Sequence, residues 1–337
     1  MFIPLFICLF TMFLLIFSNS NLSSAKTGLT LWANSVVPSL LPFFIATELL
    51  GYTNIISLLG KSLTKFMKPI FNVPGEGAFP FIMGIISGYP MGAKIVSTFK
   101  EQSICTNDEC ERLIAFTNNS GPLFIIGTIG VGLFKDAKIG FLLFLTHILA
   151  CITVGFLFRW WKSNKRKRTS CINVNNKNFQ SKISLSNLGE ILAFSIMNSI
   201  NTILLIGGFI VLFSVVISIL DDSKILQFFA NSISPVLNVF NIPNKFAEGI
   251  LTGLIEVTNG VCSVSAISNK YISTNIIICA FLLGFGGISI TLQILSITSK
   301  SEISIKPYIF GKLLQGVFAA FYTYLIIYNF PLFNLNL

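Results

Sequence analysis

Charge is scarce in this sequence. Asp, Glu, Lys and Arg make up 11% of its 337 residues, whereas a soluble domain carries about 25%. Hydrophobic residues make up 53%, and the mean hydropathy is +0.79. A water-soluble fold of this composition would expose far too much apolar surface. The composition therefore predicts an integral membrane protein.

Metal-binding and catalytic motifs are also lacking. The one histidine is His147, and the seven cysteines are scattered without a CxxC pair. Since a metal site needs clustered soft ligands, we expect no metal and no cofactor, and the odd cysteine count does not support a disulfide framework. No GxSxG, HExxH or Walker motif occurs. We therefore expect neither an enzyme nor a nucleotide-driven pump.

Basic residues are concentrated in one run, RWWKSNKRKR, at residues 159–168. The run follows an apolar segment and contains tryptophans, a pattern typical of the cytoplasmic side of a span. Anionic lipid is an alternative partner, whereas nucleic acid is not expected, because basic and aromatic residues do not interleave as they do in RNA binders. Residues 162–187 are polar and aperiodic, and we expect a basic cytoplasmic linker there.

The N-terminus is apolar but has no basic n-region, which a cleaved signal peptide normally carries. We therefore expect an uncleaved first span at residues 2–17, followed by a loop to residue 28. Cleavage near Ala25 is the alternative.

Further apolar segments approach or exceed the ~20 residues that a helix needs to cross the hydrocarbon core. They lie at residues 29–50, 79–99, 113–134, 139–161, 191–220, 249–268, 275–297 and 308–328. Two of them, 139–161 and 308–328, contain no proline and are expected to be simple spans.

Five of these segments are interrupted. The interruptions are Pro38 and Pro42, the GYP of residues 88–90, TNNSGP at 117–122, SIMNSINT at 195–202 and EVTNG at 256–260. Proline removes a backbone donor and glycine loosens a helix. Backbone groups freed in hydrocarbon cost several kcal/mol each unless protein or a wet cavity satisfies them. The interruptions therefore predict a buried, partly hydrated site.

Parts of the sequence are similar to each other. Two amphipathic stretches, 54–71 and 223–240, are expected to lie at the membrane interface or on the protein surface. KPIFNVPGEG after the first resembles SPVLNVFNIP after the second, and AFTNNSGP at residue 115 matches AFLLGFGG at residue 280. We predict two membrane repeats, 29–161 and 188–337, whose relative orientation stays open; chance similarity of low-complexity sequence is the alternative.

Polar residues gather at the interruptions, and we take them as candidate substrate-binding residues. They are Ser87, Gly88, Tyr89 and Lys94; Thr117, Asn118, Asn119 and Ser120; and Glu256, Thr258 and Asn259. A charge at bilayer depth costs at least ~2.5–3.5 kcal/mol, so Lys94 and Glu256 are expected to face a cavity or a partner, including each other. The alternatives are a snorkelling Lys94, a structural ion pair for Glu256, and asparagines that only cap half-helices. Glu48 and Glu190 are weaker candidates.

The interrupted segments also carry a family resemblance. GIISGYPMGAK and ERLIAFTNNSGPLFIIGTIGVGLF closely resemble the YlbJ-type sporulation integral membrane proteins, which belong to the nucleoside-recognition, or Gate, domain family. GLIEVTNG resembles the second-half motif of that family. The resemblance covers roughly residues 29–328, and it is looser in the second half.

The resemblance implies a fold and a function. The fold is an all-α polytopic membrane protein with two repeated halves and re-entrant or broken helices, similar to the core of concentrative nucleoside transporters. The family is linked to spore formation and to movement of dipicolinate from the mother cell into the spore across the outer forespore membrane. Dipicolinate is a dianion and would suit Lys94 and the N-termini of half-helices. Nucleoside carriers bind sugar hydroxyls with Asn and Glu, so a nucleoside-type substrate stays open.

The expected function is therefore a secondary transporter or facilitator of a small polar, anionic metabolite. A non-transporting scaffold or assembly factor of the spore envelope is the alternative. The lipid bilayer and the substrate are the expected partners, and a homo-oligomer or a sporulation membrane partner remains open.

Overall fold

The computed structural model describes residues 2–163 and 186–329. These two ranges contain helices and turns but no strand. Half of the basic run, residues 164–168, and most of the predicted linker at 162–187 lie outside the described residues.

The first range holds a series of helices joined by short turns. They are α1 (Phe2–Ile16), α2 (Ser18–Leu31), a π-helix η1 (Trp32–Val36), α3 (Val37–Gly51), α4 (Ile55–Phe71), a 3₁₀ turn η2 (Gly75–Gly77), α5 (Ala78–Ser87), α6 (Met91–Glu101), α7 (Asn107–Thr117), a π-helix η3 (Leu123–Leu133) and α8 (Ala137–Phe158).

The second range begins with the longest helix, and a similar series follows it. The elements are α9 (Leu188–Asp222), α10 (Ile225–Val239), a 3₁₀ turn η4 (Asn244–Phe246), α11 (Ala247–Ile255), α12 (Val257–Ser265), α13 (Ile272–Phe285), α14 (Gly287–Thr298) and α15 (Lys306–Asn329), with 3₁₀ turns η5 (Asn269–Tyr271) and η6 (Ser299–Ser301) between them.

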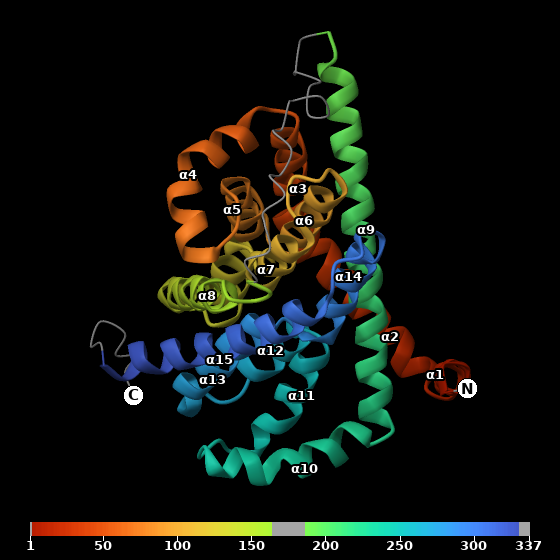
Figure 1. Ribbon diagram of the computed structural model, residues 1–337. Helices are drawn as coiled ribbons and strands as arrows, with labels where there is room; N and C mark the ends of the chain where they lie inside the picture. The colour runs from red at the N-terminus through yellow and green to blue at the C-terminus, as the bar shows by residue number, and fades with distance from the viewer. Residues whose placement is uncertain (1, 164–185, 330–337) are drawn as a thin grey trace.

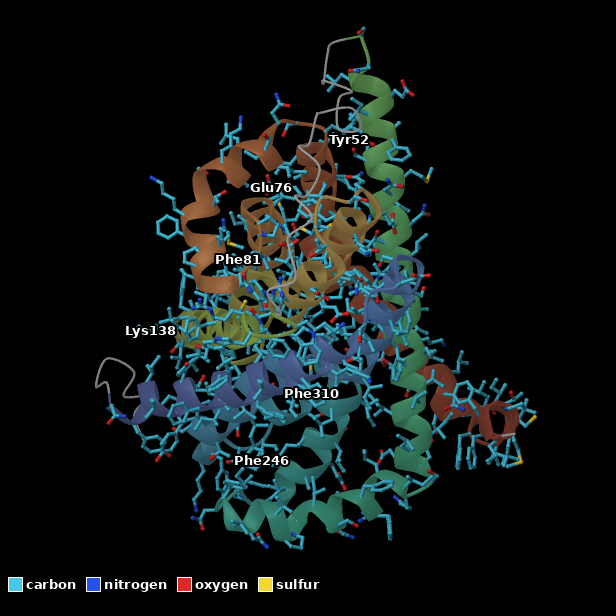
Figure 2. The ribbon with its side chains drawn as sticks, in the orientation of Figure 1. Tyr52, Glu76, Phe81, Lys138, Phe246 and Phe310 are labelled. Carbon is cyan, nitrogen blue, oxygen red and sulfur yellow. The ribbon has the colours of Figure 1, made fainter. Side chains whose placement is uncertain are left out.

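Several of these helices are long and apolar enough to cross a membrane. Within the described residues there are five, Ser18–Gly51, Ala137–Phe158, Leu188–Asp222, Ile272–Thr298 and Lys306–Asn329, and a sixth if α4 and the η2–α5 segment, which meet at 88°, form one bent span. Large apolar side chains project outward from them, such as Phe310 on α15, which is 55% exposed (Figure 2). An outward apolar coat suits lipid, and the expectation of an integral membrane protein is confirmed.

The N-terminal region differs from the expectation. Helix α1 has 15 residues, fewer than the ~20 that a span needs. The loop expected up to residue 28 is helix α2, so this expectation is wrong. The Asn21 side chain donates hydrogen bonds to the carbonyl oxygens of Phe13 and Leu14, at 3.2 and 3.3 Å, and thereby satisfies the end of α1. Polar residues therefore join the two helices here rather than separate them.

Helix α9 also differs from the expectation, because its 35 residues are unbroken. The polar residues at 195–202 were expected to interrupt it. Instead, Ser199 Oγ donates to the Ser195 carbonyl at 2.7 Å, and Thr202 Oγ1 donates to the Asn198 carbonyl at 2.8 Å. A hydroxyl that bonds the carbonyl one turn earlier leaves the helix intact.

The helices form two groups beside α9 (Figure 1). The first group, α3 to α8, lies toward the N-terminal part of α9. The second group, α10 to α14, lies toward the C-terminal part, with α14 beside the middle of α9. α15 packs against α7, α8 and α13 and thus joins the groups. Gly311 and Gly316 allow this packing, because a Cβ at either position would press against the backbone of Ala115 or Phe281.

Each group contains a helical hairpin. α5 turns back into α6, so that a Cβ built on Gly84 would lie 3.4 Å from the Cα of Gly92. α11 turns back into α12, where Gly253 and Gly260 meet backbone to backbone. A broken helix follows each hairpin: α7 and η3 after the first, α13 and α14 after the second. The predicted breaks at residues 88–90, 117–122 and 256–260 are confirmed. The interruption predicted at Pro38 and Pro42 is wrong, because the helical segment Ser18–Gly51 continues through both prolines.

The glycine contacts of the first hairpin give a prediction. In Gly92→Ala the new methyl group would overlap the Thr117 carbonyl, and overpacking of this kind costs about 1–3 kcal/mol. We expect a thermal midpoint about 2–8 °C lower in detergent. Gly208→Ala in α9 is the control, because nothing lies within 4 Å of its added methyl group. Equal midpoints for the two variants would contradict the packing described.

Candidate substrate site

The two hairpin tips and the two broken helices meet at a small cavity, here called the central cavity. Its volume is about 30 Å³, room for roughly one water molecule. The lining residues are Gly88 and Tyr89 of the first tip, Glu256, Val257 and Thr258 of the second, Gly121 between α7 and η3, Ile290 and Gln293 of α14, Val36, Ser39 and Leu40 of η1 and α3, Phe124 of η3, and Ile206 and Ile210 of α9. Predicted site residues from both halves thus line one cavity.

The first hairpin packs closely against the break between α7 and η3. The Thr117 carbonyl lies in the groove between Gly84 and Gly92, and a Cβ built on Gly88 would lie 3.0 Å from the Gly121 nitrogen. Gly88 also has a φ of +80°, which glycine adopts without steric cost. Glycines therefore set how closely the tip approaches the broken helix.

Glu256 forms the tip of the second hairpin and is 2% exposed. Its carboxylate accepts hydrogen bonds from the backbone amides of Thr258, at 3.1 Å, and Asn259, at 2.8 Å. It thereby caps the N-terminus of α12, where the helix dipole favours a negative charge. The Asn259 side chain donates to Ser214 Oγ of α9 at 3.1 Å, which ties the tip to that helix.

Lys94 does not reach Glu256, and the expected pairing of these two residues is wrong. Lys94 Nζ lies 2.6 Å from Glu48 Oε1 and 3.1 Å from Thr202 Oγ1. The reason is direction: Lys94 projects from α6 toward α3 and α9, away from the second hairpin. Nearby, the Ser87 and Thr47 hydroxyls are 2.7 Å apart. Glu48, a weaker candidate by sequence, is thus the partner of Lys94.

The polar residues after α7 belong to a second buried cluster. Gln315 Nε2 donates to Asn119 Oδ1 at 2.8 Å and lies 3.3 Å from His147 Nε2. The Ser120 amide donates to His147 Nε2 at 3.3 Å, and Asn118 Nδ2 lies 3.4 Å from Tyr308 Oη. These contacts fix the break in α7–η3 to α8 and α15.

Lys312 lies in the same cluster and is 1% exposed. Its Nζ donates to the Asn118 carbonyl at 3.0 Å and to Gln315 Oε1 at 2.9 Å. Treating residues 308–328 as a simple span missed Lys312, Gln315 and Tyr308. The signal was present in the sequence, because a lysine inside an apolar segment marks a functional or paired position.

Two larger cavities flank the central cavity. The α3–α6 cavity, about 370 Å³, is lined by Glu48, Lys94 and Asn198 among others. The α2–α12 cavity, about 530 Å³, is lined by Ser218, Asn259 and others. Helix α9 lines all three cavities. From residue 198 to residue 218 it rises about 30 Å, which matches the thickness of a hydrocarbon core.

The Lys94–Glu48 pair gives a prediction about stability. Removing one partner leaves a half-buried charge unpaired, whereas removing both does not. We expect Lys94→Gln and Glu48→Gln each to lower the thermal midpoint, and the double variant to recover most of the loss. The coupling energy expected from this cycle is about 0.5–3 kcal/mol. Additive effects of the two substitutions would contradict a direct interaction.

Comparison with known proteins agrees with these features. The family described as Gate, nucleoside recognition, matches residues 33–159 and 203–301. The matched ranges contain both hairpins and both broken helices. No solved structure matches.

A curated relative is similar over nearly the whole chain. It is the sporulation integral membrane protein YlbJ of Bacillus subtilis (strain 168), with 37% identity over 320 residues, covering 91% of this chain and 78% of the relative. Such identity over such a length shows common descent and the same fold. The chain therefore belongs to the nucleoside-recognition (Gate) family, and within it to the YlbJ-type sporulation integral membrane proteins.

Proposed function

We propose that this chain is a secondary transporter or facilitator of a small, polar, anionic metabolite. The observation that carries the proposal is the meeting of two hairpin tips and two broken helices at the central cavity, between two larger cavities along α9. Carriers place their substrates near the bilayer middle, where half-helices end and free backbone groups face the solute. The proposal assigns no catalytic step to the chain.

Negative charge on the substrate is supported by the helix ends at the site. Helices α6 and α12 both begin at the hairpin tips, at Met91 and Val257, so their N-termini lie there. N-terminal amides carry partial positive charge and bind anions. At α12 the amides of Thr258 and Asn259 already bind the Glu256 carboxylate, so the N-terminus of α6 is the end that we propose for the substrate anion. Lys94 adds a cation in the α3–α6 cavity, on the proposed route.

We further propose that the two groups of helices arose by duplication and act as moving halves. The order of hairpin, broken helix and continuous helix occurs in both, as α5 to α8 and as α11 to α15. The central cavity has room for about one water molecule, so a metabolite enters only when a hairpin tip moves away. Movement of one tip at a time would open the site to one flanking cavity at a time, which is alternating access.

Dipicolinate is the proposed substrate, moved from the mother cell toward the forespore across the outer forespore membrane. The support is the family membership and the similarity to a sporulation integral membrane protein. A nucleoside is the second candidate. It is favoured by the family description, nucleoside recognition, and by Thr258 and Gln293 at the central cavity, because these side chains both donate and accept hydrogen bonds.

Uptake of labelled dipicolinate into proteoliposomes that hold the purified chain tests the proposal. We expect uptake by the wild type and at least about a tenfold loss in Glu256→Gln, equivalent to about 1.4 kcal/mol. The reason is that the substitution removes the carboxylate at the central cavity and weakens the N-terminal cap of α12. Glu190→Gln is the control, since Glu190 is exposed in the first turn of α9. Excess nucleoside that abolishes uptake would favour the second candidate, and no uptake of either would favour a scaffold.

The Lys94–Glu48 pair separates a transport role from a structural one. We expect uptake to fall in Lys94→Gln and to stay low in the double variant with Glu48→Gln, although the double variant regains stability. The reason is that Lys94 is proposed to meet the anionic substrate on its route. Wild-type uptake by the double variant would show that the pair is only structural.

A further inference from the structure

We propose that the ammonium group of Lys312 is a built-in cation, which occupies the break between α7 and η3 in place of a bound monovalent metal ion. Such a break is where carriers bind coupling ions, because unwound carbonyls and half-helix C-termini attract positive charge. One consequence, that uptake does not require sodium, rests on the proposed transport function; the position of the Lys312 ammonium group does not. The test of the inference does not need transport.

The partners of Lys312 are those of a bound cation rather than those of an ion pair. Its ammonium group donates hydrogen bonds to two neutral oxygens, the Asn118 carbonyl and Gln315 Oε1. Among the described residues, Lys94 and Lys162 form ion pairs with carboxylates, and Lys312 takes part in none of these pairs. A buried charge requires compensation, and here carbonyl oxygens provide it.

One of these oxygens, the Asn118 carbonyl, lies at the C-terminal end of a half-helix, whereas Gln315 lies on α15. α7 ends at Thr117, and Asn118 has extended backbone angles, φ −97° and ψ 96°, which turn its carbonyl out of the helix. The end of a helix carries partial negative charge. Two further oxygens at this end, Thr117 Oγ1 and Asn118 Oδ1, are buried and have no hydrogen-bond partner. The break after α7 is therefore rich in oxygen atoms, the ligand type that a hard cation prefers.

The backbone brings the lysine to this place. Gly311 lets α15 touch the Ala115 carbonyl of α7 directly, one residue before Lys312. On its other side, a Cβ built on Gly286 would lie 3.7 Å from Lys312 Cε, and Gly286 is the break between α13 and α14. Lys312 therefore lies between the two broken helices. Lys312 does not line the central cavity, so we do not expect it to contact the substrate.

The test compares thermal unfolding of the full chain in detergent, in sodium chloride and in choline chloride at equal ionic strength. Wild type should have the same midpoint in both salts. Lys312→Ala should have a lower midpoint in choline and a saturable rise of about 2–5 °C with sodium, because the ion then binds the vacated oxygens. Lys94→Gln is the control lysine, and it should show no sodium-specific rise.

Two results would overturn the inference: a saturable, sodium-specific stabilisation of the wild type, or a Lys312→Ala variant that responds equally to sodium and choline. If Lys312→Ala does not fold, the wild-type comparison decides. In the proteoliposome assay, wild-type uptake should be equal in sodium and in choline, and a tenfold stimulation by sodium would also overturn it. Absence of all uptake would instead count against the transport function, while the unfolding result would still decide the role of Lys312.

Discussion

Backbone amides and carbonyls that leave a helix inside hydrocarbon must find partners in the protein, and the structure is arranged around this requirement. The Thr117 carbonyl lies in the glycine groove of the first hairpin. The Asn118 carbonyl accepts a hydrogen bond from Lys312, and the free amides of α12 bind the Glu256 carboxylate. Each break is thus satisfied by a residue from another element or by its own cap. The breaks are tolerated because they face one another rather than lipid.

In the proposed transport function, the same arrangement provides the route of the substrate. The breaks surround the small central cavity. On each side of it, α9 also lines a larger cavity. If the chain is the carrier that we propose, we expect the long, unbroken α9 to stay in place and the short, broken helices to move. The hairpin tips, each held by glycine contacts and a few hydrogen bonds, are the elements that we expect to move.

The sequence predicted the breaks at residues 88–90, 117–122 and 256–260, because glycine, proline and asparagine in apolar segments have local physical effects, but Pro38 and Pro42 do not interrupt the helix that contains them. It failed where the outcome depends on contacts between distant elements. The partner of Lys94 is Glu48 on α3 rather than Glu256, and no local pattern reveals which way α6 faces. The polar start of α9 stays helical because its hydroxyls bond the helix's own carbonyls. Lys312 is visible in the sequence as a lysine inside an apolar segment. Its hydrogen bond to the Asn118 carbonyl, however, depends on where α7 packs, which no local pattern reveals.

The central claim is that α9 lines a route whose two flanking cavities open to opposite sides of the membrane. The direct measurement is labelling of single cysteines by a membrane-impermeant maleimide, from each side of sealed vesicles. Asn198→Cys and Ser218→Cys are suitable positions, in a background with Cys8, Cys171 and Cys262 replaced by serine. We expect the reagent to label residue 198 from one side and residue 218 only from the other. Labelling of both positions from the same side would contradict the account.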